Sequence, residues 1–199
     1  MEFKIENTFI YGLQNSARAS GNPMRVEIEQ EYSDKSLKRL SNLSNTQIGA
    51  GHDQALTGII VQFDLYAPLY MWKQLQRYHF LDFISSQSTM HRLTKFDIKT
   101  QCVSDTDTII LDRYQELLNQ YNEEQDTTKK NQLWRTLVAS LPSGFVLGAS
   151  MTTNYRQLKT IYQQRKNHKL KEWHDFCNWI KNLPNSELIT KYEDTKSEK

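Results

Sequence analysis

The stretch GHDQALTGIIVQFDLYAPLYMWKQLQR, residues 51–77, decides the fold of this chain. Its centre, residues 58–66, is rich in β-branched and aromatic side chains with partial alternation, which predicts a β-strand. Ala67-Pro68 ends that strand, and helical spacing begins at Leu69 and predicts a helix as far as residue 84. The residues that recur at this spacing are Met71, Trp72, Leu75, His79, Phe83 and Ile84.

The rest of the chain mixes strand-like and helix-like segments and contains no internal repeat. Residues 3–13 alternate loosely and predict a strand, residues 14–24 are small and polar and predict a loop, and residues 144–151 fit a short strand or a buried loop. Helical spacing predicts further helices at residues 33–48, 108–122, 127–140, 153–166 and 168–182. This order indicates an α+β fold: one domain over residues 1–188, with a central mixed or antiparallel sheet and packed helices, then a polar tail at residues 189–199.

Composition limits the classes of partner. The 199 residues are 38% hydrophobic and 11% aromatic, enough for a packed core, yet the mean hydropathy is −0.71. Much polar surface must therefore be hydrated, or must line a large pocket or a subunit interface. The net charge is only +2, which argues against broad nucleic-acid or membrane binding, so an anion site must be a local cluster of arginine and lysine.

Metal chemistry is not expected. Cys102 and Cys177 form no CxxC spacing, and the five histidines form no HxH or HExxH spacing. We interpret both cysteines as reduced, buried thiols. The sequence shows neither an apolar run long enough to span a membrane nor a signal-peptide core at its start, so we expect a cytoplasmic protein.

Four separate segments, in this order, carry a resemblance to a known family. Ala17-Arg18-Ala19-Ser20 is similar to an A-R-V-S loop, and residues 51–77 match a G-H turn, a strand, an A-P step and a helix that leads into an arginine. The last two segments are Leu141-Pro142 with Asn154 and Arg156 after it, and Arg165 followed by Glu172, Phe176 and Ile180. Together they span residues 16–181 and resemble the flavin-dependent thymidylate synthases.

The resemblance implies a fold, an activity and a site. Family members are α+β homotetramers whose active sites lie between subunits, and they methylate dUMP to dTMP with methylenetetrahydrofolate, FAD and NADPH. Carried over by position, the residues implied for the cofactor are Arg18, His52, Asn154 and Arg156. The residues implied for the nucleotide are Arg77, His79 and Arg165. Ser86, Gln87, Ser88 and Arg92 join them if a short insertion is allowed, because the second half of the family signature has no direct counterpart here.

The sequence departs from the family pattern at two places. The family signature R-H-R-x-x-S-x-N-E-x-S-x-R keeps its first arginine as Arg77, but Tyr78 and His79 replace the next two residues. The E-H pair before the family strand, whose histidine lies at the flavin, is Thr57-Gly58 here. A glycine offers no side chain, so the resemblance supports a nucleotide pocket more than it supports FAD.

Each candidate residue also has a purely structural interpretation. The polar run SSQSTMHR, residues 85–92, fits a phosphate cradle or a surface loop that caps a helix. Arg77 fits a pocket side chain or a solvent-facing one. Arg156 and Arg165 lie nine residues apart, on opposite faces of one helix, so they serve different subunits or are solvated. The aromatic series Trp173, Phe176 and Trp179 fits helical core or an oligomer interface.

Three hypotheses for function follow. The leading one is a nucleotide-binding protein with a degenerate catalytic motif, which binds a uridine-type or other nucleotide at the interface of a homo-oligomer, expected to be a tetramer. The first alternative is an active FAD-dependent methyltransferase that makes dTMP from dUMP. The second is an interaction protein, such as a phage-type protein that sequesters a nucleotide or blocks a host factor.

Overall fold

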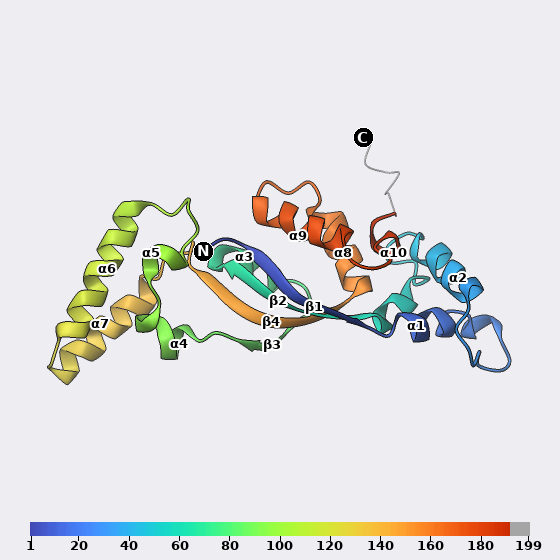
Figure 1. The fold of residues 1–199 in the computed structure, drawn as a ribbon, viewed down its shortest axis with the longest axis horizontal. Coiled ribbons are helices and arrows are strands. Elements are labelled where there is room, and N and C mark those ends of the chain that lie inside the picture. Colours follow the sequence, from blue (N-terminus) through green and yellow to red (C-terminus); the bar gives the residue numbers. More distant parts are fainter. Residues whose placement is uncertain (192–199) are drawn as a thin grey trace. The chain divides into compact units, whose positions relative to one another are not determined.

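A four-stranded sheet organises the computed structural model, which describes residues 1–191 (Figure 1). The strands lie in the order β1-β2-β4-β3, so β1 and β3 are the edges. Their bounds are Lys4–Tyr11 for β1, Ile60–Pro68 for β2, Leu81–Ser86 for β3 and Val146–Asn154 for β4. The part of the predicted tail from residue 192 to residue 199 lies outside the described residues.

Backbone hydrogen bonds at their ends show that the two central strands, β2 and β4, run antiparallel. At one end of β2, Leu69 N donates to Phe145 O at 3.0 Å; at the other end, Tyr155 N donates to Ile59 O at 3.0 Å. The residue numbers along β4 therefore rise as the residue numbers along β2 fall, which is the pairing of antiparallel strands. The predicted α+β fold with an antiparallel sheet is confirmed.

Helices fill most of the remaining chain. Four of the longer ones, α2, α6, α7 and α8, begin after side chains that accept a hydrogen bond from a backbone amide of the first turn, namely Ser33, Asp107, Asp126 and Asn154. The α-helices are α1 Leu13–Ala19, α2 Asp34–Ser44, α3 Leu69–Leu75, α4 Thr89–Arg92, α5 Ile98–Gln101, α6 Thr108–Glu123, α7 Thr127–Ala139, α8 Tyr155–Arg165, α9 Lys171–Lys181 and α10 Glu187–Thr190. The 3₁₀ turns are η1 Asn22–Met24, η2 Gln54–Gly58 and η3 Leu93–Lys95.

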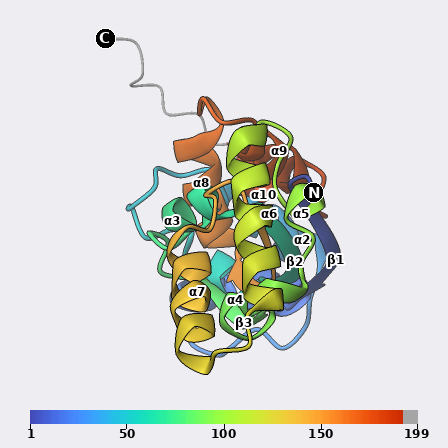
Figure 2. The same cartoon turned by 90° about the vertical axis from the view of Figure 1, so that its left-hand side faces the viewer.

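The chain divides into two compact units. The first comprises Met1–Lys4, Leu65–Arg77 and Ile84–Ser150. Within it α6 and α7 lie side by side (Figure 2), and the Tyr114 hydroxyl of α6 donates to Leu137 O of α7 at 2.9 Å. The core of this unit is apolar and fully or nearly fully buried, and it includes Ile98, Leu117, Leu118, Leu137 and Phe145.

The second unit comprises Ile5–Asp64, Tyr78–Phe83 and the described residues from Met151 onward. Its core brings α9 against β2: the rings of Phe63 and Trp179 are 4.6 Å apart, and those of Phe63 and Phe176 are 6.3 Å apart. Burial alternates along β2 as the sequence predicts. The predicted end of the domain at residue 188 falls inside α10, whose Leu188 and Ile189 are both buried.

Two predictions of secondary structure are wrong. The helix expected to reach residue 84 ends at Leu75, and residues 81–86 form β3. Helical spacing misled because Phe83 and Ile84 both project from an edge strand that is exposed on both faces, so no alternation marks the strand. The loop expected at residues 14–24 contains α1, a short polar helix that packs against α2 and η2.

The structure also decides one prediction that the sequence left open. The apolar segment 144–151, left open between strand and buried loop, belongs to β4, which continues to Asn154. No helix within residues 1–191 is long and apolar enough to cross a membrane.

Candidate functional site

The segment 77–92 places several predicted nucleotide contacts at the surface. Arg77 lies in the turn after α3, His79 precedes β3, and Arg92 ends α4; all three side chains are exposed. Within residues 1–191 none of the three makes a side-chain hydrogen bond or ion pair. Their polar atoms are therefore available to a ligand at the cost of displacing water only.

The serines and the glutamine of this segment have different surroundings. Ser86 ends β3 and is exposed, whereas the Ser88 hydroxyl caps α4 by accepting from His91 N at 3.2 Å. Gln87 extends the ladder to β4: its backbone N donates to Gly148 O at 2.9 Å, and its Oε1 accepts from Gly148 N at 2.8 Å. The Gln87 oxygen is thus used inside the fold, and the residue orients the start of α4.

Arg165 is engaged with Tyr78, the residue that departs from the family signature. The Arg165 Nε donates to the Tyr78 hydroxyl at 2.7 Å, and that hydroxyl donates to Gln164 Oε1 at 3.1 Å. The guanidinium carbon also lies 4.6 Å from the ring centre of Trp173, within cation–π range. Where the family signature has a histidine, this chain has Tyr78, whose ring is buried in the second unit. Its hydroxyl holds Arg165 by a hydrogen bond.

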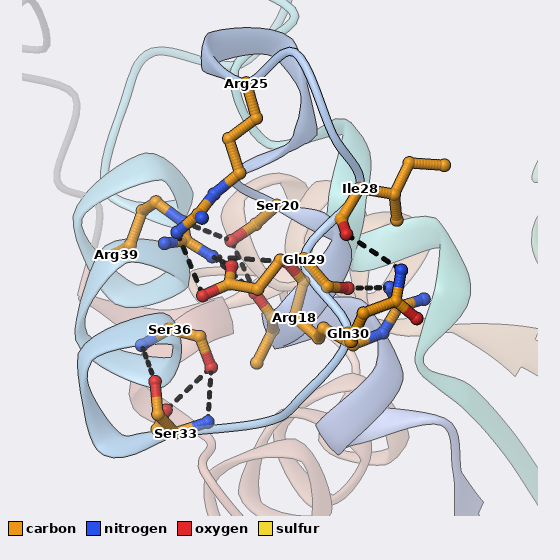
Figure 3. Close-up of polar contacts among 10 residues, drawn as sticks. Arg18, Ser20, Arg25, Ile28, Glu29, Gln30, Ser33, Ser36 and Arg39 are labelled. Carbon is orange, nitrogen blue, oxygen red and sulfur yellow. Dashed lines mark hydrogen bonds and ion pairs between the residues drawn. The ribbon is translucent and has the colours of Figure 1, made fainter.

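Arg18 is likewise tied to its own neighbourhood (Figure 3). Its Nη2 donates to Asn15 Oδ1 at 2.8 Å, and its Nη1 donates to the backbone oxygen of Glu29. The A-R-A-S motif therefore lies on α1 and joins this helix to the segment before α2. A ligand at Arg18 would compete with these internal acceptors.

The other predicted cofactor residues gather around a buried carboxylate, Asp53. Its Oδ1 accepts from Arg156 Nε at 3.1 Å, and its Oδ2 accepts from Lys159 Nζ at 3.0 Å. Asp53 follows His52 in the chain, and Asn154 caps α8 by accepting from Gln157 N at 2.8 Å. The structure thus brings His52, Asn154 and Arg156 to one region of the second unit.

Sequence reasoning missed Asp53 and Lys159. The signal for Lys159 was present, because it falls on the helical face of Tyr155, Leu158 and Tyr162, all of which are buried. A lysine on an apolar face needs a partner, which points to a buried acid. Nothing in the sequence singles out Asp53 as that acid.

A cavity of about 870 Å³ lies beside this region, in the size range of small-molecule sites. Its wall comes from α1, η1, α2 and the segment 51–58, all within the second unit. His52 and Gly58 lie on it together with Ser20, Met24 and Arg39. Of the residues predicted for the cofactor, His52 is on this wall.

Both cysteines are poor nucleophiles. Burial raises the pKa of the Cys177 thiol to about 11, and burial also raises the pKa of Cys102. A thiol with a raised pKa is almost entirely protonated at neutral pH and is therefore inert. In the described part of the chain no group of three His, Cys, Asp or Glu residues is placed to hold a metal ion.

Comparisons with known proteins give a likeness in structure and none in sequence. No family model matches the chain, and no curated protein matches it. Among solved structures, flavin-dependent thymidylate synthase from Helicobacter pylori, complexed with FAD and dUMP, aligns with a TM-score of 0.73 over 96% of this chain and 100% of that one, at 14% identity.

The chain has the fold of flavin-dependent thymidylate synthase. A second structure of the Helicobacter pylori enzyme, with FAD and dUMP, has a TM-score of 0.72, at 14% identity over 96% of this chain and 98% of that one. A UMP/dUMP methylase, PolB from Streptomyces cacaoi bound with 5-Br dUMP, has a TM-score of 0.63, at 14% identity over 96% of both chains. The resemblance found in the four motifs is confirmed at the level of the fold.

By the resemblance in sequence, Gly58 corresponds to the family histidine, and the Ser16 hydroxyl takes the space that a side chain at position 58 would need. A Cβ added to Gly58 would lie 2.4 Å from Ser16 Oγ, closer than any real contact, while Ser16 Cβ would be 3.6 Å away. Tyr78, the other departure, is buried against Arg165 and Trp173. The residues at these two positions therefore do not fit the flavin contacts that the resemblance implies.

The conflict at Gly58 predicts a specific double-mutant result. Gly58→Ala should lower the free energy of unfolding by about 1–3 kcal/mol, because the new methyl group overlaps the Ser16 hydroxyl. In the Ser16→Ala background the same change should cost much less, since the added Cβ then meets Ser16 Cβ at an ordinary van der Waals distance. Urea unfolding of the four proteins measures the coupling, and equal losses in both backgrounds would disprove the overlap.

Proposed function

We propose that this chain is a nucleotide-binding protein that uses the thymidylate synthase fold without methyl transfer, and that it binds a uridine-type or other nucleotide where subunits meet. The observation that carries the proposal is the likeness along 96% of the chain to proteins solved with dUMP or 5-Br dUMP. The fold is retained, but Gly58 and Tyr78 differ from the residues of the family motif. This combination supports nucleotide binding over methyl transfer.

The recognition is assigned to the exposed segment 77–92. The Arg77 guanidinium binds a phosphate through two parallel hydrogen bonds, and Arg92 adds a second positive charge. Ser86 supplies a hydroxyl that no intramolecular bond occupies in the described residues. Arg165 contributes less, because it must first give up its bond to Tyr78. These residues bind and orient an anion and move no proton.

Replacing Arg77 tests this assignment. Arg77→Lys should weaken dUMP binding by roughly tenfold to a hundredfold, because an ammonium cannot reproduce a paired guanidinium bond worth about 1.5–3 kcal/mol. The melting temperature should stay nearly unchanged, since Arg77 is exposed and makes no internal bond. Isothermal titration calorimetry with dUMP gives the affinity, and a thermal melt gives the stability.

Arg113→Lys is the matched control for Arg77→Lys. Arg113 is also exposed, on α6, and its Nη1 pairs with Glu116 at 2.8 Å. The control should change neither affinity nor melting temperature appreciably. A loss of stability in Arg77→Lys with unchanged affinity would show that Arg77 holds the fold and does not bind the phosphate.

The alternative of an active FAD-dependent methyltransferase predicts a different outcome. We expect the purified protein to lack a flavin absorption band and to fail to support growth of a thymidylate-synthase-deficient strain without thymidine, because the positions equivalent to two flavin contacts are a packed glycine and a buried tyrosine. Absorbance spectroscopy and growth assays check both. A yellow protein that rescues growth would replace the binding proposal with the enzyme.

An interfacial site also requires self-association, and we propose a homo-oligomer, with a tetramer as the expected state. Phe83 and Ile84 are adjacent on the edge strand β3, project to opposite faces and are both exposed. Exposed apolar side chains on an edge strand favour burial against another chain.

Light scattering should therefore give a mass near four times 23.5 kDa. Replacing Phe83 and Ile84 by serine should shift the population toward the monomer, because less apolar area is buried on association. A monomer of the unmodified chain at micromolar concentration would contradict both the oligomer and the interfacial site. A tight complex with a foreign protein, without bound nucleotide, would favour the interaction-protein alternative.

A further inference from the structure

Three arginines contact a single residue, Glu29, between α1 and α2, two of them through its carboxylate (Figure 3). Glu29 Oε1 accepts from Arg25 Nη2 at 3.0 Å, and Glu29 Oε2 accepts from Arg39 Nη2 at 2.6 Å. Arg18 donates to the backbone oxygen of the same residue. One carboxylate neutralises one of the three guanidinium charges, so the cluster still attracts anions.

The position of Arg39 is fixed by the end of α1. Its Nε donates to Ser20 Oγ at 3.1 Å, and its Nη2 donates to the backbone oxygens of Ala17 and Arg18, both at 3.2 Å. Gly21 makes this approach feasible, because a Cβ there would lie 2.6 Å from the guanidinium carbon. The guanidinium is therefore preorganised for an acceptor, which reduces the entropic cost of binding one.

Arg39 also lies on the wall of the cavity of about 870 Å³. Most of the nearby wall is apolar and includes Ala19, Met24 and Leu43. Asn22 lies on the same wall, and its Oδ1 is buried without a hydrogen-bond partner among the described residues. A fixed guanidinium on a mostly apolar wall favours a ligand with an apolar body and an anionic group, and a donor on that ligand could also bind Asn22 Oδ1.

Within residues 1–191 the carboxylate of Glu29 is held by its two ion pairs with Arg25 and Arg39. The side chains of Arg25, Arg39 and Glu29 are 44%, 29% and 16% exposed, so solvent weakens these ion pairs. Residues 25–33 form neither helix nor strand, and the bond from Arg18 holds the backbone of Glu29 and not its side chain. Rotation of the side chain alone would free both guanidinium groups.

We propose that this cavity binds a small aromatic anion, and that the anionic group of the ligand takes the place of the Glu29 carboxylate at Arg25 and Arg39. Glu29 is then an internal competitor that keeps the arginines paired until a ligand arrives. The site is built from different arginines than the segment 77–92, so it does not rest on the proposed nucleotide function.

Phenyl phosphate, an aromatic ring with one phosphate, is the probe for this site. Glu29→Gln should strengthen its binding about threefold to tenfold, because the competing charge is gone while the side-chain shape is kept. Arg39→Gln should weaken it about tenfold or more, because a charge-assisted hydrogen bond is lost. Isothermal titration calorimetry on the full chain measures both, and phenol, which lacks the phosphate, should respond to neither change.

Two further variants distinguish this site from the nucleotide site and from a folding defect. Arg77→Gln should leave the affinity for phenyl phosphate unchanged; an affinity that depends on Arg77 and not on Arg39 would overturn the proposal. Gly21→Ala should weaken binding by displacing Arg39 while a thermal melt shows a folded protein. If Arg39→Gln fails to fold, the affinity of Glu29→Gln for phenyl phosphate is the deciding measurement. No binding of phenyl phosphate, or no gain in Glu29→Gln, also overturns the proposal.

Discussion

The ion pair between the buried Asp53 carboxylate and Lys159 is the interaction on which the segment 51–58 depends. Asp53 and Lys159 are 2% and 1% exposed, and their charges face each other at 3.0 Å. Lys159 Nζ also donates to Ser44 O at 2.6 Å and to Thr46 O at 3.0 Å, so one ammonium joins α8, the end of α2 and the segment before η2. Removal of one partner would leave an uncompensated buried charge, which typically costs about 3–5 kcal/mol. Such a pair specifies one placement of the segment 51–58.

That placement explains why the chain departs from the family at position 58. With η2 fixed, Gly58 O lies where a Cβ on Gly12 would be 2.3 Å away, and Gly12 has a φ of +83°, which glycine adopts without strain. Ser16, one turn into α1, fills the space on the other side of Gly58. The start of α1 therefore packs directly onto the end of η2, at the position where the resemblance in sequence implies a histidine.

The sequence predicts those helices and strands in which the spacing of apolar residues matches the face that is buried in the structure. The strand β2 alternates, and the apolar face of α9 follows helical spacing, so both predictions were confirmed. The strand β3 was missed because an edge strand with two exposed faces has no periodicity to detect. The Glu29 cluster was missed for another reason: Arg25 and Arg39 meet the Glu29 carboxylate, and Arg18 meets its backbone oxygen, only after α1 and α2 pack together.

The predicted site residues differ in whether the fold already supplies hydrogen-bond partners for their side chains. Arg18, Arg156 and Arg165 already donate to Glu29 O, to Asp53 and to the Tyr78 hydroxyl, so a ligand must replace an existing bond and the net gain is small. Arg77 and Arg92 lose only water when they bind an anion. The sequence places Arg77 at a position of the family signature, and Arg92 matches it only if a short insertion is allowed, but it carries no information on which acceptors the fold already supplies. If the chain binds a nucleotide as proposed, the segment 77–92 is therefore the better place for the anion, and Arg18, Arg156 and Arg165 already have partners within the fold.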